Sequence, residues 1–109
     1  MAYARGRLRD PHSAPAAGED VTRLAQLPHA VVEQILSGRI DGPLDYRQDE
    51  DEWVVVLHGR AVLDVEDERI HLGPGDWVLL PALTPHRLVE TDPGTSWLTV
   101  TSPVPTLGH

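Results

Sequence analysis

EWVVVLHG, residues 52–59, decides the fold together with GDWVLLPALTPH, residues 75–86. In the first stretch a carboxylate leads an apolar run and a glycine closes it. In the second a glycine opens such a run, a proline closes it, and a histidine follows at position 86. Apolar runs bounded by glycine and proline predict strands. Carboxylate and imidazole are both ligands for borderline divalent metals, and we expect the fold to bring Glu52 and His86 together inside a small β-barrel.

Short runs of the same kind continue on both sides of these two stretches. Because they are evenly spaced and separated by turn residues, they favour an all-β sandwich or barrel. A helix is possible only over residues 21–27, where Pro28 would end it. Residues 1–20 have the composition of a tail, residues 21–105 form the predicted barrel, and residues 106–109 form a second tail. The predicted strands cover residues 30–37, 44–48, 53–58, 61–65, 69–72, 77–80, 86–91 and 96–101.

Length and charge limit the function classes. A chain of 109 residues forms one domain. The net charge of −8 argues against nucleic acid and anionic membranes as partners. No segment approaches the roughly 20 apolar residues of a membrane span, and no signal peptide is visible, so we expect a cytoplasmic protein. The small core favours a homodimer, and the N-terminal tail is a candidate to cross to the partner.

The first stretch resembles half of a cupin motif. That motif runs glycine, five residues, His-x-His, three or four residues, glutamate, six residues, glycine; Glu52 and Gly59 keep its second half at the right spacing. Where cupins usually have His-x-His, this chain has Tyr46 and Gln48. This substitution is similar to a subset of small bacterial cupins that carry Tyr-x-Gln.

The second stretch resembles the other cupin motif, which runs glycine, five residues, Pro-x-Gly, two residues, histidine, three residues, asparagine. Gly75, Pro81 and His86 keep their places, while Leu83 and Glu90 replace the middle glycine and the asparagine. The two motifs and the turn before Gly75 extend the resemblance over roughly residues 30–101. It implies a single antiparallel jelly-roll barrel with a metal pocket.

Residue by residue, the resemblance supports Glu52 and His86 as ligands, with Gln48 as a weaker third. Such a set with open positions could suit one iron, manganese, nickel or zinc ion, with lower affinity than the usual three-histidine, one-glutamate cupin. A metal-free polar pocket is the alternative. No organic cofactor is expected. His58 lies about 20 Å along the strand from Glu52 and cannot share its ion, and His71 is predicted to face solvent.

Three functions remain open for this chain. The first is a metal-dependent enzyme acting on a small organic substrate, with Tyr46 and Glu90 as candidate acid–base groups. The second is a metal-free cyclase or isomerase in which Glu52 and His86 act as acid and base. The third is a non-catalytic ligand-binding or sensor domain. In each case we expect the pocket to be lined by Tyr46, Val54, Val56, Leu88, Glu90 and Trp97.

Overall fold

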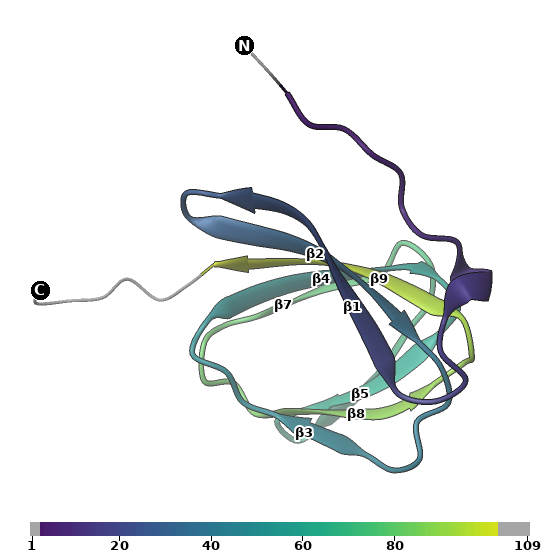
Figure 1. The fold of residues 1–109 in the computed structure, drawn as a ribbon. Helices are drawn as coiled ribbons and strands as arrows, with labels where there is room; N and C mark the ends of the chain where they lie inside the picture. Colours follow the sequence, from purple (N-terminus) through teal and green to yellow (C-terminus); the bar gives the residue numbers. More distant parts are fainter. Residues whose placement is uncertain (1–2, 103–109) are drawn as a thin grey trace, which may run out of the picture.

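A computed structural model describes residues 3–102 as a two-layered all-β fold (Figure 1). One sheet has five strands in the order β1-β2-β9-β4-β7, and the other has four in the order β3-β8-β5-β6. All pairings between named strands are antiparallel, which confirms the predicted jelly-roll barrel. The strands are β1 (Glu19–Leu27), β2 (Ala30–Ser37), β3 (Leu44–Tyr46), β4 (Asp51–His58), β5 (Ala61–Val65), β6 (Glu68–Leu72), β7 (Trp77–Leu80), β8 (His86–Thr91) and β9 (Thr95–Ser102).

The core lies between the two sheets because alternate residues of each strand point inward. In β4, Val54 and Val56 are buried, whereas the neighbouring Trp53 and Val55 are only partly covered. Apolar residues of β5, β6 and β8 in the other sheet pack against this strand, together with Trp97 of the neighbouring strand β9. The buried core cluster consists of Val54, Val56, Ala61, Leu63, Leu72, Leu88 and Trp97.

The helix considered for residues 21–27 is wrong, because this segment forms most of strand β1. Val21, Leu24 and Leu27 recur every three residues, which mimics a helical face, but all three side chains are exposed. The chain turns after Leu27 and pairs β1 with β2 as an antiparallel hairpin. Pairing with β2 provides hydrogen-bond partners for the backbone N–H and C=O groups of this segment. Strand β1 begins at Glu19, so the last two residues of the predicted tail belong to it.

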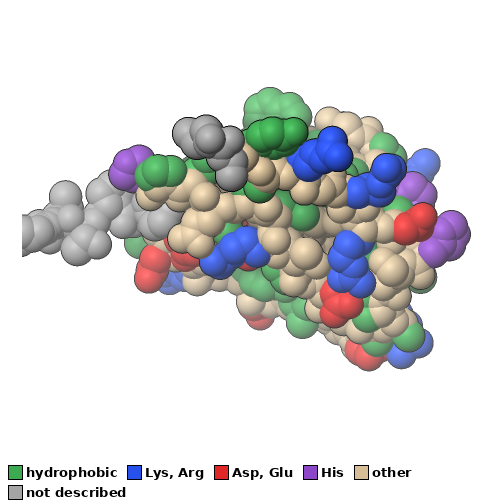
Figure 2. Space-filling view, turned by 45° about the horizontal axis from the view of Figure 1, so that its top comes forward, with side chains coloured by type: hydrophobic (Ala, Val, Ile, Leu, Met, Phe, Trp, Pro, Cys, Tyr) green, Lys and Arg blue, Asp and Glu red, His purple; other side chains and the backbone are tan. Residues whose placement is uncertain are grey.

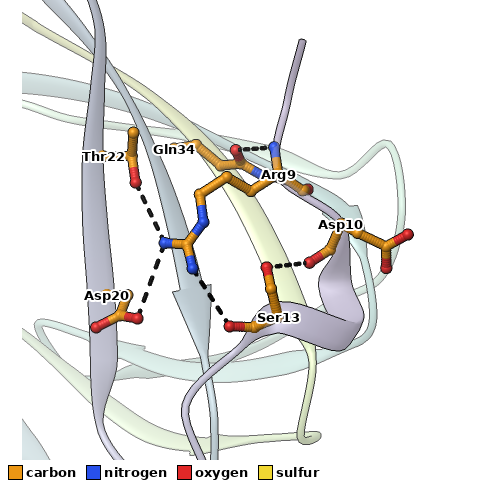
Figure 3. A network of polar contacts seen from close by, with 6 residues as sticks. All are labelled: Arg9, Asp10, Ser13, Asp20, Thr22 and Gln34. Atoms are coloured by element: carbon orange, nitrogen blue, oxygen red, sulfur yellow. Dashed lines mark hydrogen bonds and ion pairs between the residues drawn. The ribbon is translucent and has the colours of Figure 1, made fainter.

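The N-terminal segment lies against β1 and β2 of its own chain. The Arg9 amide donates to Gln34 Oε1 at 2.8 Å, and Gln34 Nε2 donates back to the Arg9 carbonyl at 3.0 Å (Figure 3). The Arg9 guanidinium donates to Thr22 Oγ1 and lies 3.8 Å from Asp20. A short 3₁₀ helix, η1 (Pro11–Ser13), follows and begins at the Asp10 cap. The predicted crossing of this segment to a partner stays a prediction.

No helix within residues 3–102 has the length and the apolar character needed to cross a membrane. The end of the predicted barrel at residue 105 and the predicted C-terminal tail lie outside the described residues.

Candidate functional site

A cavity of about 250 Å³ opens between the two sheets. Strands of both sheets contribute to its wall, which is mostly apolar and also carries several polar side chains. Four of the residues predicted to line the pocket lie in this wall, namely Tyr46, Val54, Leu88 and Trp97. The full lining is Glu19, Val21, Ile35, Tyr46, Gln48, Glu52, Val54, Leu63, Leu80, His86, Leu88, Trp97 and Thr99.

His86 enters the cavity at the first position of β8. Its side chain is buried, and its Nδ1 lies 3.0 Å from the carbonyl oxygen of Thr84. Because a carbonyl only accepts hydrogen bonds, Nδ1 must carry a proton, and in the neutral form of the ring the lone pair is therefore on Nε2. The ring also stacks on Tyr46, its register partner on β3, with the ring centroids 5.5 Å apart. These two contacts fix both the orientation and the tautomer of the imidazole.

Glu52 reaches the same cavity from β4, on the opposite sheet. Burial raises the pKa of its carboxyl group above the ordinary value. His86 and the Gln48 amide act in the other direction, whereas Glu19 and Glu50 raise the pKa further. The structure therefore brings Glu52, His86, Gln48 and Tyr46 together at one cavity, with a carboxyl group that holds its proton more firmly than usual.

Glu19 is a site residue that the sequence reasoning missed. Tyr46 Oη donates to Glu19 Oε1 at 3.0 Å, and Ser37 Oγ donates to Glu19 Oε2 at 2.7 Å. Trp97 Nε1 in turn donates to Ser37 Oγ at 2.9 Å. Burial is also the main reason that the pKa of Tyr46 is raised, with the Glu19 carboxylate adding to the effect.

One signal in the sequence could have found Glu19. Glu19 and Val21 are two residues apart, and the alternation of a strand puts both on one face; this face lies opposite Ser37 and Ile35 of β2. The sequence composition favours a tail up to residue 20 and allows a helix over residues 21–27. Neither structure places every second residue on one face, so Glu19 and Val21 are not expected to lie together.

Two of the residues expected to line the pocket lie elsewhere. Val56 is on the inward face of β4 but is fully buried in the core cluster, so it has no exposure to the cavity. Glu90 is exposed and lines a different surface hollow, with Arg60 and His71 among its neighbours. A β-bulge explains this position: Val62 pairs with Glu90 but Leu63 pairs with Leu88, so Val89 is an extra residue. Past the bulge, the alternation of β8 is reversed.

The other two histidines considered are remote from this cavity. His58 is exposed at the end of β4, with Nδ1 3.2 Å from the Gly94 carbonyl oxygen, and His71 is exposed on β6.

The donor set fits a resident metal ion poorly. The cavity lining offers the imidazole of His86, the side-chain amide of Gln48 and two carboxyl groups, those of Glu52 and Glu19. Both oxygens of Glu19 already accept a hydrogen bond, from Tyr46 and Ser37. Within residues 3–102, no three histidine, cysteine or acidic side chains are grouped closely enough to hold an ion. Neutral amide oxygen is a weak substitute for the imidazoles that select transition metals.

The family model of the cupin domain matches residues 31–101. The chain belongs to the cupin family. This match spans both motifs of the sequence, from β2 to β9, and confirms the resemblance from which the barrel was predicted. As a member of this family, the protein is a small-molecule-binding cupin. No curated protein sequence matches this cupin significantly.

Many solved structures share the fold. A proposed mannose-6-phosphate isomerase from Ralstonia eutropha JMP134 is 28% identical, with a TM-score of 0.74 over 91% of this cupin and 100% of that chain. KdgF from a Halomonas species is 22% identical, with a TM-score of 0.68 over 81% and 82% of the two chains. A PAC13 variant from Streptomyces, solved with uridine, is 19% identical, with a TM-score of 0.65 over 83% and 73%.

Proposed function

We propose that this cupin binds a small organic molecule in the barrel cavity and moves a proton on it, with Glu52 and His86 as the acid–base pair. The reaction class is isomerisation or a related proton transfer, which needs no redox partner. The single observation that supports it best is the hydrogen bond from His86 Nδ1 to the Thr84 carbonyl. It leaves Nε2 as a base at a cavity that also contains a carboxyl group of raised pKa.

Each residue has a distinct part in this proposal. His86 Nε2 accepts a proton from the substrate, while Thr84 stabilises the imidazolium that forms because its carbonyl keeps accepting from Nδ1. Glu52, protonated more readily than an exposed glutamate, returns a proton to a second substrate atom. Tyr46 is a positioning residue, since its ring stacks on His86 while its hydroxyl is held by Glu19.

The cavity limits the substrate. Its volume of about 250 Å³ is below the range of roughly 300–1,000 Å³ that is common for drug-sized ligands. All nine basic residues of the chain are arginines, and none lines the cavity. A phosphate or carboxylate group would find no cationic partner there. The sugar phosphate in the name of the Ralstonia relative is therefore a poor candidate for this cupin.

Isotope exchange tests the proton transfer directly. Small aldehydes and ketones are incubated with the protein in D₂O, and the loss of the hydrogens next to the carbonyl is followed by NMR. We expect the wild type to accelerate exchange in at least one compound. His86→Gln and Glu52→Gln should each lower the rate about 10²-fold or more, the usual contribution of a positioned acid or base.

His58→Gln is the matched control, because His58 is exposed and outside the cavity; it should leave the exchange rate unchanged. If His86→Gln retained the wild-type rate, the acid–base assignment would be wrong. Binding without exchange by any compound would instead support the non-catalytic sensor.

The metal expected from the family stays a prediction, and the same assay separates it from the acid–base proposal. Exchange that survives a chelator supports the metal-free route. Exchange that is lost with EDTA and restored by iron, manganese, nickel or zinc would support the metal-dependent alternative, with Gln48, Glu52 and His86 as ligands.

A further inference from the structure

Within residues 3–102, no arginine forms an ion pair with either carboxyl group of the cavity, and His86 is the basic side chain that acts on Glu52. Six ion pairs occur among residues 3–102, and neither Glu19 nor Glu52 takes part in any of them. Both side chains nevertheless line one cavity, from β1 and β4. Carboxylates that are withdrawn from water are strongly destabilised unless a positive charge or several hydrogen bonds compensate them.

The hydrogen bonds that Glu19 accepts satisfy only part of its capacity. Tyr46 and Ser37 each donate one hydrogen bond, to different oxygens of this carboxylate. An ionised carboxylate has about four acceptor positions, so each oxygen can accept from a ligand as well. The side of the cavity where Glu19 and Glu52 lie is therefore rich in acceptors.

The rest of the wall suits a short hydrocarbon body. Val21, Ile35 and Leu80 line the cavity from β1, β2 and β7, and such apolar surface stabilises an alkyl group. The rings of Tyr46 and Trp97 also belong to the lining, and aromatic faces attract cations but not anions.

From these observations we infer that the ligand of this cavity is a small organic cation, an ammonium group on a short apolar body, and that Glu19 is the residue that selects its charge. The inference rests on the proposed function for the location of the site, and it adds the class of substrate. The ammonium donates to Glu19 and Glu52, and its hydrocarbon part lies on the apolar wall. Charge-assisted hydrogen bonds of this kind are about twice as strong as neutral ones.

Three probes with one carbon skeleton test the inference: 3-methylbutylammonium, 3-methylbutan-1-ol and 3-methylbutanoate. Their affinities for the full-length protein are measured by NMR titration at constant pH and ionic strength, following the signals of Leu63, Leu88 and Trp97. We expect the ammonium to bind about tenfold or more tightly than the alcohol, and the carboxylate to bind most weakly.

Glu19→Gln should bring the affinity for the ammonium close to that for the alcohol, while the affinity for the alcohol itself stays within about twofold. The ratio of the two affinities is measured within one variant, so a general loss of stability would not mimic this result. Glu90→Gln is the matched control, because Glu90 is exposed and outside the cavity; it should keep the wild-type ratio.

The outcomes separate this inference from the proposed function. If the alcohol or the carboxylate bound as tightly as the ammonium, the cation preference would be refuted while small-molecule binding in the cavity stood. If none of the three probes shifted the cavity signals at millimolar concentration, the cation inference would be refuted, while the proposed proton transfer would still be decided by exchange in the aldehydes and ketones.

Discussion

At the scale of single residues, the site depends on what surrounds each polar group. Glu52 and His86 were predictable from the sequence, because each sits at a fixed distance from a glycine that bounds a strand. Their chemistry was not predictable, because it comes from Thr84 and Gln48 next to them and from their burial. Sequence spacing locates a side chain on a strand, but its tautomer and its pKa depend on neighbours that only the tertiary structure supplies.

The raised pKa of Glu52 gives stability a defined pH dependence. A carboxyl group with a higher pKa in the folded state binds protons more tightly there, so its contribution is fully present below the ordinary pKa and is lost as pH rises through the folded value. Glu52→Gln has no such titration. We expect the difference in melting temperature, variant minus wild type, to become more positive between pH 4 and pH 8 when followed by circular dichroism.

A difference that stayed constant over this pH range would show that the pKa of Glu52 is the same in the folded and unfolded states. Glu66→Gln is the reference substitution, since Glu66 is an exposed residue of the turn between β5 and β6 and its replacement should change stability little.

The Tyr46 hydroxyl should contribute measurably to stability. Tyr46→Phe keeps the ring that stacks on His86 but removes the donor to Glu19. We expect a loss of about 0.5–1.5 kcal/mol in the free energy of unfolding, the usual net value of a hydrogen bond, measured by urea denaturation. Tyr3 is the other tyrosine of the chain and is 83% exposed. Tyr3→Phe should therefore have no effect, and an equal loss in both variants would contradict the assignment.

At the scale of elements, the strands whose apolar runs are bounded by turn residues were the easiest to predict. β5, β7 and β8 have the bounds expected from the apolar runs and their flanking turn residues. β1 was not predicted because most of its side chains are exposed. A strand with neither face buried does not need apolar and polar residues in alternation, and this alternation is the signal by which strands are predicted. The bulge at Val89 was also invisible, because an extra residue on one strand is defined only by the register with its partner.

The contact between the N-terminal segment and the sheet should depend on Gly38. A Cβ atom at this position would lie 2.0 Å from the Pro15 carbonyl oxygen and 2.8 Å from the Ala16 carbonyl carbon, and both are backbone atoms that cannot rotate away. We expect Gly38→Ala to displace residues 9–17 and to cost about 1–3 kcal/mol, as overpacking usually does. Faster amide exchange at Arg9 and Gln34, measured by NMR, would report the displacement.

Gly42→Ala is the control for this substitution, because a Cβ atom at Gly42 would meet no atom within 4 Å. It should change stability by less than about 0.5 kcal/mol. If Gly38→Ala were equally mild and left the exchange at Arg9 unchanged, the segment would not be held by this close approach.

At the scale of the whole molecule, the five-stranded sheet carries apolar side chains on its outward face at β4 and β7 as well as on its inward face. Its inward face belongs to the core and the cavity. Its outward face also carries apolar residues in register, with Val55 opposite Trp77 and Trp53 opposite Leu79; Trp77 is 61% and Leu79 is 55% exposed. Figure 2, which is turned toward this sheet, shows hydrophobic side chains in contact with solvent. Exposed apolar surface of this kind marks interaction sites in soluble proteins.

The homodimer predicted from the size of the core would bury this outward face. β7 is an edge strand of the sheet, so a second copy could pack on the face and shield the unpaired edge at the same time. Trp53 and Trp77 already contact each other, with ring centroids 6.2 Å apart, and together they form a rigid aromatic centre of the type that dominates interface energetics.

Light scattering with size-exclusion chromatography tests the assembly. We expect a mass of twice 12.0 kDa for the wild type, and a mass of 12.0 kDa for Trp77→Glu, because a buried unpaired carboxylate at the centre of an interface opposes association. Trp77→Phe should stay dimeric, since it keeps an aromatic side chain at this position.

His71→Glu, on the exposed side of β6 in the other sheet, introduces the same charge away from the proposed interface and should also stay dimeric. A wild-type mass of 12.0 kDa at all concentrations would refute the dimer, and dissociation by His71→Glu but not Trp77→Glu would place the interface on the opposite sheet.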